Sequence, residues 1–100
     1  MKNFSIEIHG VGFHVPTATG GTTEGFVVMA FVEAENESDA CDFALRTVIG
    51  AEDFHIRIGC HADPDRAQVW AEQWYELASF EGCTLPHGDF VFFSSEAPLQ

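Results

Sequence analysis

Apolar and polar residues alternate near the start of the chain as they do in a half-buried β-strand. Over Asn3–His9, the side chains of Phe4, Ile6 and Ile8 share one face and polar residues share the other. A Gly-containing loop follows over Thr17–Thr23. It lacks the lysine and the spacing of a phosphate-binding loop, and a second apolar strand follows it. The loop therefore predicts a hairpin connection.

The segment Glu24–Ala34 predicts a second strand, apolar at almost every position. A strand of this kind is typical of the centre of a sheet, where both faces are covered. One face carries Phe26, Val28, Ala30 and Val32, and the other carries Val27, Met29 and Phe31.

The apolar period changes from two to 3.6 after Asn36, which is a favoured N-cap residue. Asp39, three residues later, supports a start that resembles a capping box, and acids in the first turns suit the helix dipole. Gly50 offers a stop. The segment predicts a helix that packs on the sheet through one stripe. That stripe consists of Ala40, Phe43, Ala44, Thr47 and Val48.

The second half of the chain is harder to assign. Phe54, Ile56 and Ile58 alternate with polar residues and predict a short strand. Ala67–Phe80 fits both a helical face and an alternating strand. Asp89–Ser95 predicts a final strand, and the tail EAPLQ after it is expected to fray.

Composition limits the partners of the chain. One hundred residues suit one domain, 1–100, and sixteen acids against four basic residues give a net charge of −12. Such a charge repels phosphate backbones and anionic membrane surfaces, but it favours a basic protein partner. The three cysteines, at 41, 60 and 83, are an odd number with no tight pairing motif, which suits a reducing compartment. A cytoplasmic location is therefore expected. No run is long enough for a membrane span.

Several segments together resemble a widespread family of small bacterial proteins of unknown function. They are FSIEIHGVGF, GFVVMAFVEAENESDA, ADP, AEQWYELASFEG and LPHGDFVFFSSE. The resemblance implies that Ala67–Phe80 is a strand, because relatives carry β-branched alternation there. The family usually has polar residues and an arginine in the second strand, where this chain is apolar over 28–31. The resemblance implies no activity.

These elements define an α+β fold. We expect an antiparallel-rich sheet of about four strands, in the chain order β-β-α-β-β, with one main helix packed on one face.

Histidine and cysteine residues raise the question of a metal site. The tightest group is His55, Cys60 and His61. Zinc sites use such ligands at set spacings, and neighbours such as Cys60 and His61 rarely face one ion in an extended segment. These residues are therefore weak candidates, and no cofactor is expected. No local signature of an activated nucleophile is present, so the chain is expected not to be an enzyme.

One helix covers only one face of the sheet, so the second apolar face needs another cover. Val27, Met29 and Phe31 lie on that face, and Trp70 and Trp74 are candidates to join them, either within the core or at an interface. We expect a homodimer through this face. The leading hypothesis is a non-enzymatic interaction module, with a basic protein as a further partner. The alternative is a small-ligand or metal-binding domain that uses its His and Cys residues.

Overall fold

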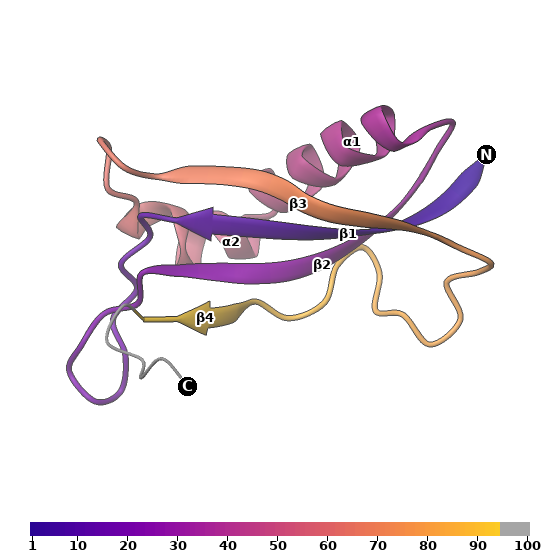
Figure 1. The fold of residues 1–100 in the computed structure, drawn as a ribbon. Helices are drawn as coiled ribbons and strands as arrows, with labels where there is room; N and C mark the ends of the chain where they lie inside the picture. The colour runs from indigo at the N-terminus through magenta and orange to yellow at the C-terminus, as the bar shows by residue number, and fades with distance from the viewer. Residues whose placement is uncertain (95–100) are drawn as a thin grey trace.

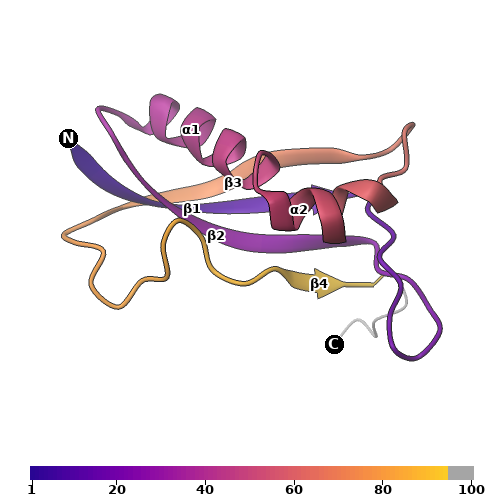
Figure 2. The same ribbon diagram turned by 180° about the vertical axis from the view of Figure 1, so that it is seen from behind.

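The structure, a computed structural model, describes residues 1–94 of the chain. Four strands form one antiparallel sheet in the order β3-β1-β2-β4, and both helices lie on the same face of it (Figures 1 and 2). This confirms the α+β class. The elements are β1 (Lys2–Val11), β2 (Gly25–Ala34), α1 (Glu37–Ile49), α2 (Glu52–Arg57), a 3₁₀ turn (Gly59–His61), β3 (Gln68–Leu77) and β4 (Val91–Phe93).

The first two strands form the predicted hairpin. They pair antiparallel along their full length, from Lys2 opposite Ala34 to Val11 opposite Gly25. The loop closes through the backbone N–H of Thr17, which donates to a carbonyl in the loop at 2.9 Å. β1 and β2 therefore form the centre of the sheet, with β3 added beyond β1 and β4 beyond β2.

The core lies between this sheet and the two helices. β1 contributes Phe4, Ile6 and Ile8, which are at most 2% exposed, as alternation predicted. At the α2 end, the rings of Phe13, Phe26, Phe54 and Phe90 form a cluster with most centroids 5.3 to 6.2 Å apart. Such edge-to-face groups bury large areas from few positions.

The helix α1 begins as predicted, and the residues that it buries belong to the predicted stripe, but one member of that stripe is exposed. The Asn36 side chain accepts a hydrogen bond from the Asp39 N–H at 2.9 Å, which is the N-cap interaction. Its buried residues are Ala40, Ala44 and Val48. The prediction for Phe43 was wrong, because this ring is 56% exposed. Small residues every four positions let the helix lie close to the sheet, and the large ring is left at its flank.

The predicted short strand through Phe54, Ile56 and Ile58 was wrong, because the segment forms α2 and the 3₁₀ turn. Phe54 and Ile58 are at most 5% exposed, whereas Ile56 is 64% exposed. Residues four apart share one side of a helix, and the residue between them points away. Three alternating apolar residues fit the period of a strand, and the first and last of them also fit the period of a helix.

The ambiguous segment is a strand, as the resemblance implied. β3 spans Gln68–Leu77 and pairs with β1, with a β-bulge opposite the step from Glu7 to Ile8. β4 is shorter than predicted, at Val91–Phe93. The predicted end of this strand at Ser95 and the tail at 96–100 lie outside the described residues.

Candidate functional site

One face of the sheet has no helix over it, and Figure 1 looks onto this face with both helices behind. Side chains that are directly opposite one another in paired strands point to the same face. Because Ala30 and Val28 pair with the buried Ile6 and Ile8, the intervening residues of β2 point to the helix-free face. An apolar row runs over β2 and β4 there, which we call the open-face strip. It consists of Val27, Met29, Phe31, Val91 and Phe93.

The open-face strip is only partly covered by its own chain. Phe80, from the connection between β3 and β4, places its ring 6.3 Å from that of Phe31. Val91 remains 66% exposed and Phe93 39% exposed. Large apolar side chains therefore meet solvent along one row of a sheet face.

The part of the helix-free face that β1 and β3 form is mostly polar, and its glutamate side chains accept hydrogen bonds from neighbouring side chains. His9 Nε2 lies 2.6 Å from Glu7 Oε2, and the indole N–H of Trp70 donates to Glu72 Oε1 at 2.6 Å. The rings of His9 and Trp70 are 5.8 Å apart. Ser5, between Phe31 and Tyr75 in the register, is only 6% exposed. This half is therefore ordered by contacts within the chain.

The structure places Trp70 on the same face as Val27, but it places Trp74 on the other face. Trp74 pairs with the buried Ile6, so it points to the helix side, where it is 46% exposed at the edge of the sheet. Residues four apart in a regular strand share a face. The β-bulge inserts one extra residue between the two tryptophans and reverses the alternation.

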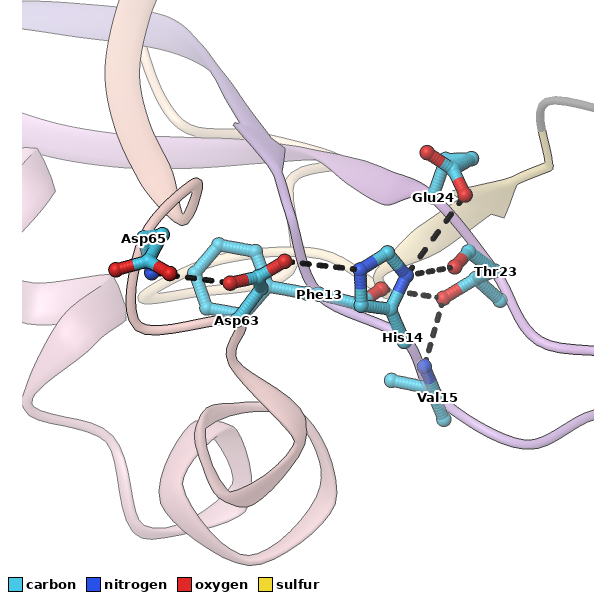
Figure 3. Close-up of polar contacts among 7 residues, drawn as sticks. All are labelled: Phe13, His14, Val15, Thr23, Glu24, Asp63 and Asp65. Carbon is cyan, nitrogen blue, oxygen red and sulfur yellow. Dashed lines mark hydrogen bonds and ion pairs between the residues drawn. The ribbon is translucent and has the colours of Figure 1, made fainter.

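A cluster of polar side chains that the sequence did not single out lies where β1 ends (Figure 3). The ring of His14 lies between two carboxylates, with Nδ1 3.7 Å from Glu24 Oε2 and Nε2 3.8 Å from Asp63 Oδ2. The same Nδ1 is 3.1 Å from the carbonyl oxygen of Thr23. The backbone N–H of His14 also donates to the backbone carbonyl of His61 at 3.0 Å. The cluster therefore joins the hairpin to the turn that precedes β3.

This His14 cluster suits a structural role better than catalysis. Figure 3 shows Asp63 and Glu24 on opposite sides of the ring, so the two carboxylates do not converge on one point. The hydroxyl of Thr23 donates to the Phe13 carbonyl at 2.7 Å and accepts from the Val15 N–H at 3.0 Å. A hydroxyl held in this way is not presented to a substrate.

The metal candidates are spread over α2 and the 3₁₀ turn. His55 and Cys60 are exposed, and the Cys60 thiol donates to the Ile56 carbonyl at 3.2 Å. His61 is half-buried and uses its carbonyl for His14. Within residues 1–94, no three His, Cys, Asp or Glu side chains form a group that could hold a metal ion.

A shallow apolar hollow lies beside the start of β3, with a volume of about 470 Å³. Its lining joins β3 to the helices, and it includes one candidate histidine and one candidate cysteine. The lining includes Ile49, Phe54, His55, Cys60, Ala67 and Val69.

The surroundings of Cys41 disfavour the thiolate form of its side chain. Burial raises its pKa, and the carboxylates of Asp42 and Glu37 raise it further. A raised pKa lowers the fraction of thiolate, which is the nucleophilic form.

No helix in the described part of the chain has the length and apolar character to cross a membrane. Comparisons with protein-family models, curated proteins and solved structures found no match to this chain. The resemblance to small bacterial proteins therefore stays a prediction.

Proposed function

We propose that this chain is a non-enzymatic protein-interaction module that forms a homodimer through the helix-free face of its sheet. The observation that carries this proposal is the open-face strip, a row of apolar side chains that neither helix covers. Exposed apolar rows on a regular, rigid surface are typical of interfaces.

The lack of charged side chains on the open-face strip allows two copies of this acidic chain to meet there. A molecule with a net charge of −12 repels its own copies, so self-association needs a surface with few free charges. The open-face strip contains no charged residue. The neighbouring Glu7 and Glu72 already accept hydrogen bonds within their own chain.

The face is also large enough. A ten-residue strand is about 33 Å long and four strands are about 19 Å wide, which gives on the order of 600 Å². Stable interfaces bury about 600 to 1,000 Å² on each partner, so this face lies at the lower end of the range. Two such sheets packed face to face would form a sandwich, with the helices on the outside.

Sedimentation analysis at tens of micromolar tests this proposal with a matched pair of variants. We expect the unaltered chain to sediment at twice its mass of 11.0 kDa. Val91→Lys should give monomers, because it places a charge in the open-face strip. Ile56→Lys should leave the dimer intact, because Ile56 is equally exposed, at 64% against 66%, but lies on α2.

A monomer at 11.0 kDa for the unaltered chain would rule out the homodimer. Dissociation by Ile56→Lys as well as by Val91→Lys would assign the contact to another surface. Circular dichroism of both variants checks that the fold is retained.

Non-enzymatic action belongs to the proposal because the thiol of Cys41 and the hydroxyl of Thr23 are both poorly placed for attack. The alternative, a metal-binding domain, has less support, because His55, Cys60 and His61 belong to no three-ligand group among the described residues. A cytoplasmic location and a basic partner are parts of the same proposal, and the acidic charge supports the second.

A further inference from the structure

β3 is a long strand with a partner on one side only. In the sheet order β3-β1-β2-β4 it occupies an edge, and it runs for ten residues. Figure 1 shows it as the orange strand at the margin of the sheet, with α1 behind and above it, and no other strand of the described sheet pairs with its outer side. Half of the backbone N–H and C=O groups of such a strand point away from the sheet and can pair with another extended chain.

The charges on β3 decide which kind of chain can pair with it. Glu72 and Glu76 are exposed, and β3 contains no lysine or arginine. Pairing two copies of β3 would bring these carboxylates close together, which costs energy on neighbouring strands. An extended segment that carries lysine or arginine would instead gain opposite-charge pairs. The edge is therefore protected against its own copy and open to a basic strand.

The apolar hollow lies where such a strand would place one of its side chains. Val69 lines the hollow and pairs with Gly10, whose other partner is the buried Phe26, so Val69 points to the helix side. A residue opposite Val69 on an added strand would point to the same side. It would enter the hollow between β3 and Ile49, which is 39% exposed.

We propose that the free edge of β3 binds an extended basic segment of another protein by strand addition. An apolar side chain of that segment fills the hollow beside Val69, and its basic side chains lie next to Glu72 and Glu76. In this mode of recognition, backbone hydrogen bonds supply affinity and pockets for alternate side chains supply specificity. The surface differs from the open-face strip, so this proposal and the homodimer fail independently.

A synthetic ten-residue peptide serves as the probe. It carries one leucine, lysines three and six positions away from it, and threonine elsewhere, and it is made in both chain directions. The spacing of six follows from the β-bulge, because the extra residue of β3 takes no partner of its own.

Binding is measured by fluorescence, because both tryptophans of the chain, Trp70 and Trp74, lie on β3. We expect one peptide direction to change the fluorescence in a saturable way and to bind more weakly as salt is added. Replacing its leucine by alanine should weaken binding about tenfold, since a large apolar group leaves the hollow. Hydrogen exchange should slow at amides of β3.

The matched variants test the charges. Glu72→Gln with Glu76→Gln should weaken binding about fivefold. Glu37→Gln with Glu52→Gln removes the same charge from the two helices and should leave binding unchanged. Equal losses in both double variants, protection at β2 instead of β3, or no effect of the leucine would overturn the proposal. Failure of both peptides to bind, or a homodimer whose protected amides lie on β3, would overturn it as well.

Discussion

Replacing Gly10 by alanine tests the packing at the centre of the core. Gly10 lies on β1 directly opposite Phe26, and the phenylalanine ring covers it. A methyl group at Gly10 would lie 2.3 Å from Cε2 of this ring and 2.5 Å from Cζ. Carbon atoms pack at about 3.5 to 4.0 Å, so the ring would have to move by about 1 Å.

The ring has little room for this movement. Phe26 is fully buried, and its centroid is 5.4 Å from that of Phe13 and 5.3 Å from that of Phe90. Overpacking of this kind costs about 3 kcal/mol at the upper end of the usual range. Alanine at Gly10 recovers about 0.7 kcal/mol through the lower entropy of the unfolded chain. The net loss of unfolding free energy is about 2 kcal/mol.

Urea unfolding followed by circular dichroism measures this loss, and the midpoint should fall by about 1 M. Gly21→Ala is the control, because its added methyl group would have no atom nearer than 3.8 Å. In a Phe26→Leu background, Gly10→Ala should cost less than about 1 kcal/mol, because the opposing ring is gone. A cost below about 0.5 kcal/mol in the unaltered chain, or an equal cost in both backgrounds, would refute the steric argument.

Three further predictions concern the cap, the His14 cluster and the thiols. Asn36→Ala should lower the unfolding free energy by about 1 kcal/mol, and Asn36→Ser, which keeps a capping oxygen without adding a charge beside Asp39, should leave it nearly unchanged, as urea unfolding would show. His14→Ala should cost about 1 to 2 kcal/mol in the same assay, whereas His55→Ala, at an exposed site on α2, should cost less than about 0.5 kcal/mol. At pH 8, iodoacetamide should alkylate Cys41 at least about tenfold more slowly than the exposed Cys60, because burial shields Cys41 and raises its pKa. Peptide mass spectrometry measures both rates, and equal rates would contradict this account.

The first two strands and the main helix could be predicted because local signals there agree with the tertiary packing. Over β1 and β2 the alternation matches the buried face, and at Asn36 the cap residue forms the bond that its type predicts. The error at α2 has a different origin. Phe54, Ile56 and Ile58 fit a period of two, but only contact with the phenylalanine cluster decides that the first and last are buried together.

The candidate site was less predictable, because it depends on contacts between distant segments. His14, Glu24 and Asp63 come from three parts of the chain, and no spacing in the sequence relates them. The open-face strip was predicted for β2, but Val91 and Phe93 join it only because β4 pairs beside β2.

The two tryptophans show how one residue changes the surfaces that the chain presents. Without the β-bulge, Trp70 and Trp74 would share one face of the sheet. The extra residue turns Trp70 to that face, beside His9, and turns Trp74 to the helix side of the sheet edge. No local pattern in β3 marks the bulge, since each half alternates regularly by itself. The bulge therefore places one tryptophan on the face where we propose that the homodimer forms, and it leaves the other at the edge of the sheet on the helix side.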